Sequence, residues 1–221
     1  MRENKVLGII FSNMHDTILG ELTENRTTGS VPFGGRYRMV DFVLSSMVNS
    51  DITDVGIITK QNYQSLMDHV GAGRAWDLAR KRGGLVILPP FASRGGGIYR
   101  GRLEALGGAM GYIKRCNAKY VVLCDCDIIS NIDLRSMIHE HIKSGAQITM
   151  MVKNTQIQPE SIRDVTTVFF DSDHNVTDIM MRPDVQGNQN VYMNVLLIEK
   201  TLLDHAGHWS VHCFPCLRYI V

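Results

Sequence analysis

The sequence predicts an α/β fold built on a doubly wound, mostly parallel sheet with antiparallel additions. Short apolar runs alternate with segments of helical periodicity up to about residue 153, and the connections between them are short. Such an alternation is typical of strands that are buried between two layers of helices. Beyond residue 166 the apolar runs follow one another more closely, which indicates antiparallel strands.

The individual elements follow from local patterns. Residues 5–11 form a continuous apolar run, and residues 119–127 are apolar until they end in carboxylates, so both are expected to be buried strands. Residues 38–50 place apolar side chains at helical spacing. Asp133 is a residue type that caps helices, and a helix is predicted from there to about residue 143. Further strands are predicted at 54–60, 84–90, 147–153, 166–171, 175–181 and 190–199, and further helices at 62–70 and 102–115.

Composition argues against several classes of partner. Hydrophobic residues make up 44% of the chain, charged residues 20%, and the formal net charge is +1. Without a bulk basic field, neither a nucleic acid nor a membrane is expected as a partner. No apolar run approaches the ~18 residues of a membrane span, and we expect no signal peptide at the N-terminus. Five cysteines, an odd number, favour a reduced, cytoplasmic setting.

Two carboxylates stand at the end of the strand predicted at 119–127. Asp125 and Asp127 alternate with Cys126, so both side chains are expected on one side of the strand. Ligands of open α/β sheets bind at the carboxyl ends of the strands, where a carboxylate can hold a Mg²⁺ ion that bridges phosphate oxygens. The alternative is an aspartate that only caps a helix or a turn, and for an isolated pair this interpretation is about equally common.

A second candidate site is the segment SVPFGGRYRMVDF at 30–42. Gly34 and Gly35 allow the backbone to pass close to a ligand. Arg36 and Arg38 follow at the predicted helix start, where the helix dipole disfavours a cation unless a carboxylate or phosphate is nearby. The alternative is a pair of solvated arginines.

Other motifs carry less weight. The glycine run at 95–97 could approach phosphates, although such a run is more often a mobile loop. Neither a GxxxxGK[ST] phosphate loop nor a GxGxxG motif after the first strand is present. The tail has a spacing that zinc could use, without a second metal-binding pair elsewhere. Its histidines and cysteines are His205, His208, His212, Cys213 and Cys216.

Several segments together resemble glucose-1-phosphate adenylyltransferase, also called ADP-glucose pyrophosphorylase. VPFGGRYRMVDFVLSSMVNSDITDVGIIT at 31–59 is similar to the family signature, and GAGRAWDLAR at 71–80, LPPF at 88–91 and IYRG at 98–101 follow in the family's order. The resemblance covers most of residues 5–203. It implies a Rossmann-like nucleotide-diphospho-sugar transferase fold. It also implies the reaction of ATP with glucose 1-phosphate to give ADP-glucose and pyrophosphate, with Mg²⁺ as cofactor.

The resemblance also implies roles for single residues. Asp127 matches the metal-binding aspartate and Tyr99 a sugar-phosphate tyrosine, while Arg182 stands at the lysine of a sugar-phosphate Glu-Lys pair. The nucleotide-binding positions of the family fall on two segments of this chain. They are Ser12, Asn13, Met14 and Ile18 in the first loop, and Gly34, Gly35 and Arg38 in the signature.

The first loop departs from the family pattern LAGGxGxRL, because this chain has FSNMHDTIL at 11–19. Asn13 and Met14 replace glycines that let the backbone touch the nucleotide, Asp16 adds a negative charge, and Ile18 replaces a phosphate-clamping arginine. Other departures replace residues that line the family's ligand pockets. They are Thr28, Arg102, Glu104, Thr166, Met181 and Tyr192.

A preserved scaffold with a degenerate phosphate loop resembles the regulatory, poorly active subunit of the bacterial two-subunit enzyme. The implied partner is the catalytic subunit in a hetero-oligomer, with ATP or ADP-glucose and glucose 1-phosphate as ligands. Two alternatives stay open: an active sugar-phosphate nucleotidyltransferase, and a truncated fragment without activity. We expect one nucleotidyltransferase-like domain at 1–203 and an atypical tail at 204–221, without the family's C-terminal β-helix domain.

Overall fold

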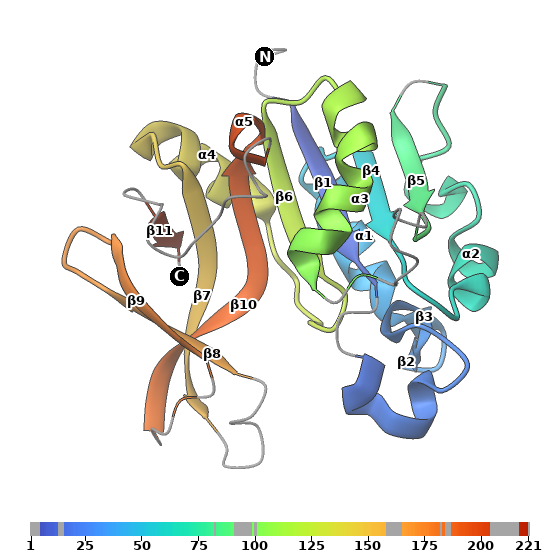
Figure 1. Cartoon of the computed structure of the whole chain (residues 1–221), viewed down its shortest axis with the longest axis horizontal. Coiled ribbons are helices and arrows are strands. Elements are labelled where there is room, and N and C mark those ends of the chain that lie inside the picture. The colour runs from blue at the N-terminus through green and yellow to red at the C-terminus, as the bar shows by residue number, and fades with distance from the viewer. Residues whose placement is uncertain are drawn as a thin grey trace.

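The computed structural model describes residues 5–12, 16–81, 83–90, 99, 101–157, 165–181, 183, 187–203 and 217–220, with the backbone alone described at 16–18 and 217–220. Within these residues, nine strands form one mixed sheet and two short strands form a separate hairpin (Figure 1). The strands of the sheet are β1 (Val6–Phe11), β4 (Asp54–Ile58), β5 (Gly84–Leu88), β6 (Tyr120–Asp125), β7 (Ile148–Ile157), β8 (Thr166–Phe170), β9 (Val176–Met181), β10 (Gly187–Glu199) and β11 (Leu217–Ile220). The hairpin consists of β2 (Pro32–Phe33) and β3 (Tyr37–Arg38).

The helices occupy the connections between the strands, as the sequence predicts for a doubly wound fold. The α-helices are α1 (Met39–Asn49), α2 (Gln64–Val70), α3 (Arg102–Arg115), α4 (Leu134–Ser144) and α5 (Lys200–Leu203). The 3-10 helices are η1 (Asp16–Thr23), η2 (Thr28–Ser30) and η3 (Arg74–Trp76). None of the helices in the described part of the chain is long and apolar enough to cross a membrane.

The centre of the sheet is parallel, in the order β6-β1-β4-β5. Phe11 pairs with Ile58 on one side and with Asp125 on the other, so the carboxyl ends of β1, β4 and β6 meet at one edge. β10 lies antiparallel between β6 and β7, and β8 and β9 pair antiparallel beside it. The predicted parallel sheet with antiparallel additions is therefore confirmed.

Two hydrophobic clusters pack the helices against opposite faces of the sheet. α3 covers one face with Ala105, Leu106 and Ile113, which contact buried side chains of β1 and β6. α1 and α4 cover the other face, where Leu44 and Met137 belong to a second cluster. Figure 1 shows α3 in front of the sheet and α1 behind it. Strands buried on both faces explain why the central runs are apolar without alternation.

The strands β7 and β10 are longer than the sequence predicts. β7 was expected to end at residue 153, but the pairing continues to Ile157, which lies opposite Gly187 at the start of β10. This extension is polar, with exposed side chains from Lys153 to Gln156, so the apolar signal fades before the backbone pairing ends. A further strand, β11, lies parallel to β7 at the sheet edge within the predicted tail, where no strand was expected.

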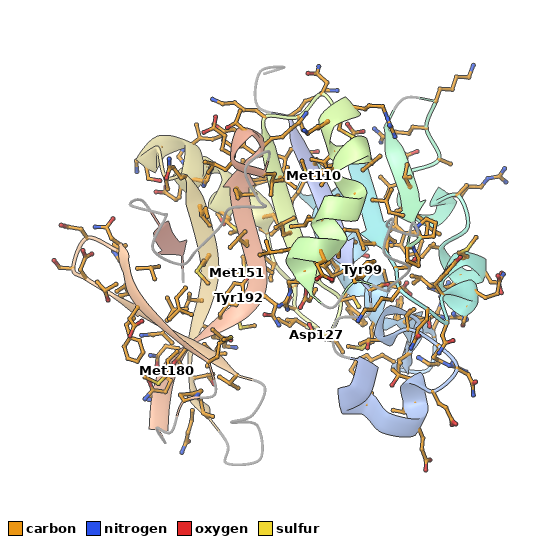
Figure 2. All side chains as sticks on the ribbon, in the orientation of Figure 1. Tyr99, Met110, Asp127, Met151, Met180 and Tyr192 are labelled. Atoms are coloured by element: carbon orange, nitrogen blue, oxygen red, sulfur yellow. The ribbon has the colours of Figure 1, made fainter. Side chains whose placement is uncertain are left out.

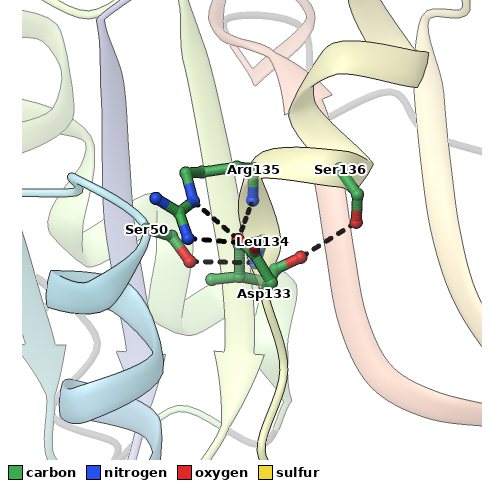
Figure 3. Close-up of polar contacts among 5 residues, drawn as sticks. All are labelled: Ser50, Asp133, Leu134, Arg135 and Ser136. Atoms are coloured by element: carbon green, nitrogen blue, oxygen red, sulfur yellow. Dashed lines mark hydrogen bonds and ion pairs between the residues drawn. The ribbon is translucent and has the colours of Figure 1, made fainter.

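The start of α4 confirms the predicted N-cap at Asp133 and adds a buried partner (Figure 3). The Asp133 carboxylate accepts the Arg135 backbone N–H at 3.0 Å. Oγ of Ser50, which follows α1, accepts the backbone N–H of Leu134 at 2.9 Å. Ser50 is buried, so this hydrogen bond ties the end of α1 to the start of α4 away from water.

Replacing Ser50 with alanine is expected to lower the free energy of unfolding by about 1–2 kcal/mol, because the buried N–H of Leu134 then loses its partner. Urea denaturation at neutral pH measures this difference. The matched control is Ser136→Ala, because the Ser136 hydroxyl is exposed and only donates to the Asp133 carbonyl at 3.0 Å. Equal effects of the two substitutions would contradict a structural role for the buried bond.

His141 of α4 is a buried titratable group in the same region. Its side chain is 1% exposed, Nδ1 lies 2.7 Å from the Thr149 hydroxyl, and its ring packs edge-on against Tyr120. Burial, with a smaller contribution from the charge of Lys119, lowers the pKa of His141 to about 4. In the unfolded chain the pKa of a histidine is about 6.5. Between these values the unfolded state binds more protons than the folded state.

Folding stability is therefore expected to be complete above about pH 6.5 and to fall as the pH drops toward 4, by on the order of 3 kcal/mol from this residue. Urea unfolding at pH 7 and pH 5 measures the loss. In His141→Gln, which does not titrate, the loss should be smaller, whereas His139→Gln on the exposed side of α4 should behave like the parent. An unchanged pH dependence in His141→Gln would refute this origin.

Candidate functional site

The candidate site lies at the sheet edge where the parallel strands β1, β4 and β6 end. In each pairing the last residues stand side by side, with Phe11 next to Ile58 and Asp125. Tyr99 and Asp127 lie at this same edge (Figure 2). Side chains that are distant in the sequence therefore converge here, as expected for an open α/β sheet.

Ser12, the first residue after β1, is fixed on both sides. Its side chain is fully buried and donates to the Ile58 carbonyl at 2.9 Å. Its own carbonyl accepts from the Gly29 N–H at 2.9 Å and from Sγ of Cys126 at 3.2 Å. A Cβ on Gly29 would stand 3.3 Å from both Cys126 Sγ and Ser12 Cβ, so this junction is tightly packed. The entry to the first loop is held against η2 and the end of β6.

An ion pair joins the start of α3 to the end of β6. Nε of Arg102 donates to Oδ1 of Asp125 at 3.1 Å, and Nη2 of Arg102 donates to Oδ2 of the same carboxylate. The Asp125 side chain is 3% exposed and that of Arg102 is 41% exposed. Burial lowers the pKa of Arg102, but the hydrogen bonds and charge of Asp125 outweigh it and hold that pKa above its ordinary value. The pair is bidentate, a geometry that fixes both side chains.

Two further polar groups lie within electrostatic reach of this pair. The charge of Asp127, just past β6, favours the charged form of the Arg102 guanidinium, and Tyr192 from β10 lies near the same group. Burial raises the pKa of Tyr192, and the positive charge of Arg102 opposes that rise. The Arg102 cation is thus held by the Asp125 carboxylate, with the Asp127 carboxylate and a neutral phenol within electrostatic reach. Asp127, which the resemblance implied as the metal-binding aspartate, and Tyr192, which replaces a pocket residue of the resembled family, both lie near this pair.

Tyr99 lies beside a cavity of about 310 Å³ between α3 and the ends of β4 and β5. Its hydroxyl donates to the Thr59 carbonyl, and the Lys60 ammonium stands 5.8 Å from the centre of its ring. Glu104 and Pro89 also line the cavity. The cavity combines apolar walls with a few polar groups, as small-molecule sites commonly do.

The signature segment forms the β2–β3 hairpin and the start of α1. Gly34 and Gly35 occupy its turn with φ of +62° and +79°, and a Cβ on either would meet nothing within 4 Å. The Arg38 guanidinium donates to the Ser65 carbonyl at 2.5 Å and to its hydroxyl at 2.8 Å. The Arg38 backbone N–H donates to Asp41 at 2.9 Å. In the structure Arg38 joins α1 to α2, and its role in nucleotide binding stays a prediction.

Several predicted site residues lie outside the part of the chain that the structure describes. Asn13, Met14 and Arg182 are among them, and Ile18 is described only by its backbone within η1. The glycine run at 95–97 and the histidines and cysteines of the tail are also outside. Within the described residues, no three His, Cys, Asp or Glu side chains gather as a metal site would require.

The ion pair between Arg102 and Asp125 is the feature that sequence reasoning missed. The sequence had marked Arg102 as a departure from the resembled family and Asp125 as a carboxylate at a strand end. These two charges of opposite sign could have indicated an ion pair. The sequence alone does not show that the start of α3 lies over the end of β6.

Comparison with known proteins shows which family this chain belongs to. Residues 8–196 match the nucleotidyl transferase family. The chain is 36% identical over 216 residues to a glucose-1-phosphate adenylyltransferase of Pseudothermotoga lettingae, which covers 95% of the chain and 51% of that protein. It is 42% identical over 147 residues to the glycogen biosynthesis protein GlgD of Geobacillus stearothermophilus, covering 66% of the chain and 43% of that protein.

A solved structure of a putative glucose-1-phosphate thymidylyltransferase from Bacillus anthracis shares the fold, with a TM-score of 0.74 at 15% identity. The match covers 97% of this chain and 86% of that one. The chain spans about half the length of the curated relatives it matches. The family match covers most of the chain, including most of β1 and the carboxylates Asp125 and Asp127. The chain therefore belongs to the nucleotidyl transferase family.

Proposed function

We propose that this chain acts as a regulatory subunit for glucose-1-phosphate adenylyltransferase in glycogen biosynthesis and has little turnover of its own. The observation that carries the proposal is the loop that follows β1. Residues 12–19 read SNMHDTIL and contain neither a glycine nor an arginine. This loop begins at the carboxyl edge of the sheet, where ligands of open α/β folds bind.

The chemistry of nucleotidyl transfer explains why this loop matters. A sugar-phosphate oxygen attacks the α-phosphorus of a nucleoside triphosphate, and the protein acts by positioning the reactants and stabilising negative charge. Bare backbone N–H groups and an arginine serve that purpose well, whereas Asn13, Met14 and Asp16 offer side chains and a negative charge instead. Losing an arginine of this kind costs about 10³–10⁵ in rate in related phosphoryl transfers.

Similarity to two kinds of relative supports a role beside a catalytic partner. The chain resembles both a protein named glucose-1-phosphate adenylyltransferase and one named glycogen biosynthesis protein GlgD. The higher identity, over a shorter region, is to the GlgD protein. An intact scaffold with a degenerate loop is what a subunit needs when it must associate with its partner without catalysing the reaction.

Mixing the purified protein with the catalytic subunit of the same organism tests the proposal. We expect a hetero-oligomer by sedimentation, and a change in the rate or effector response of ADP-glucose formation relative to the catalytic subunit alone. The control is a mixture with an unrelated protein of similar size. The proposal fails if the two proteins sediment separately and the kinetics of the catalytic subunit are unchanged.

Retention of Asp127 and Tyr99 at the sheet edge favours residual binding of ligands. We therefore expect the isolated protein to bind a sugar phosphate or nucleotide weakly, without converting it. Isothermal titration with glucose 1-phosphate and with ADP-glucose measures this binding, and Tyr99→Phe is a conservative variant that removes only the hydroxyl donated to Thr59.

A further inference from the structure

The side chains gathered after β6 do not fit the Mg²⁺ ion that family membership implies for Asp127. Mg²⁺ needs oxygen ligands in near-octahedral geometry. Both oxygens of the neighbouring Asp125 carboxylate accept N–H groups of Arg102. Among the described residues, no cluster of three potential metal-ligating side chains is formed here. Both oxygens of the Asp125 carboxylate are therefore already used by an organic cation.

The charge of Arg102 also disfavours a divalent cation at this edge. Asp127 lies close enough to the Arg102 guanidinium for its negative charge to stabilise that cation. A divalent ion bound to Asp127 would stand near a permanent positive charge, because an arginine does not lose its proton in a protein. Solvent screens this repulsion only in part, because the Arg102 side chain is 41% exposed.

The position of Arg102 indicates that the pair persists as a unit. Arg102 is the first residue of α3, where the helix dipole disfavours a cation. Asp125 is a buried carboxylate, which needs a compensating charge to remain ionised. Each residue thus offsets the unfavourable placement of the other, and loss of either would leave an uncompensated charge at the sheet edge.

We infer that the Arg102 guanidinium takes the place of the divalent cation at this edge, so that the protein neither needs nor binds Mg²⁺ there. The inference deepens the proposed function, because a site that carries its own cation at the carboxylates cannot position a metal-bound triphosphate. The inference is tested by measuring metal binding, which is independent of the assembly and rate measurements that test the proposed function.

Titration of Mn²⁺ with detection of the free ion by electron paramagnetic resonance tests this inference on the whole protein. The parent should show no saturable Mn²⁺ site at millimolar concentrations. Arg102→Thr, which introduces the residue of the family pattern, should bind one Mn²⁺ with a dissociation constant at least ~10-fold lower than any parent binding. Adding Asp127→Asn to that variant should remove the gain, and Arg102→Lys, which keeps the charge, should resemble the parent.

The outcomes separate the hypotheses. A saturable Mn²⁺ site in the parent that is lost in Asp127→Asn would overturn the inference, and this comparison decides the matter even if Arg102→Thr does not fold. Failure of Arg102→Thr to gain a site while remaining folded would overturn it as well. Neither result would touch the proposed function, which fails only through assembly and kinetics measured with the catalytic subunit.

Discussion

Gly84→Ala is expected to lower the free energy of unfolding by more than about 3 kcal/mol, the largest effect on stability that we predict for a single added methyl group. Gly84 begins β5 with φ of +88°, a conformation that L-residues rarely adopt. A Cβ there would stand 2.2 Å from the Leu78 carbonyl oxygen and 3.3 Å from the Arg80 nitrogen. Both are backbone atoms, so no side chain can turn aside to make room.

The surrounding hydrogen bonds explain why the backbone cannot shift easily. The Leu78 carbonyl accepts from Leu85 at 3.1 Å and from Arg80 at 3.0 Å, and the Gly84 N–H donates to Thr53 at 2.9 Å. Relief of the clash would break the hydrogen bonds that hold the start of β5 to Thr53 and Leu78. Urea or thermal unfolding measures the loss.

Gly34→Ala is the matched control, because Gly34 also has a positive φ, +62°, but a Cβ there meets nothing within 4 Å. In Gly34→Ala the free energy of unfolding should fall by about 1–2 kcal/mol, because only the unfavourable backbone conformation contributes. Similar stabilities of the two alanine variants would show that the clash at Gly84 is not real.

Arg102→Met is expected to destabilise the protein by about 2–3 kcal/mol, because it leaves the Asp125 carboxylate buried without its partner. The estimate lies below the usual range for a buried pair since the Arg102 side chain is 41% exposed and water can partly compensate. Methionine keeps much of the length and apolar character of the arginine stem, so the lost charge rather than lost packing should dominate.

A double-mutant cycle with Asp125→Asn isolates the pair. The double variant should be more stable than the sum of the two single effects predicts, by about 1–3 kcal/mol, because the second substitution removes the charge that the first leaves uncompensated. Additive effects within about 0.5 kcal/mol would contradict a coupled pair and would also weaken the case for a cation held at this edge.

The fold could be predicted from the sequence wherever strands are buried on both faces. The runs that became β1, β4 and β6 are apolar because α1, α3 and α4 cover them. The prediction failed where pairing does not depend on burial, as in the polar extension of β7 to Ile157 and in the edge strand β11. Backbone hydrogen bonds at an exposed edge do not require apolar side chains, so the pattern of apolar and polar residues does not reveal them.

The candidate site was predicted in part for a similar reason. Asp127 could be placed because it follows an unmistakable strand, and Tyr192 because it fell at a pocket position of the resembled family. The bond from Ser12 to Ile58 and the pairing of Arg102 with Asp125 depend on which strands and helices become neighbours. Such long-range contacts are decided by topology, which a single sequence encodes only indirectly.

We expect that this chain does not catalyse nucleotidyl transfer by itself. The most direct measurement is the rate at which the isolated protein forms labelled ADP-glucose from ATP, glucose 1-phosphate and Mg²⁺, compared under the same conditions with the catalytic subunit alone. We predict a rate lower by at least about 10³-fold, the smaller effect expected from the missing arginine. A rate within tenfold of that of the catalytic subunit would contradict it.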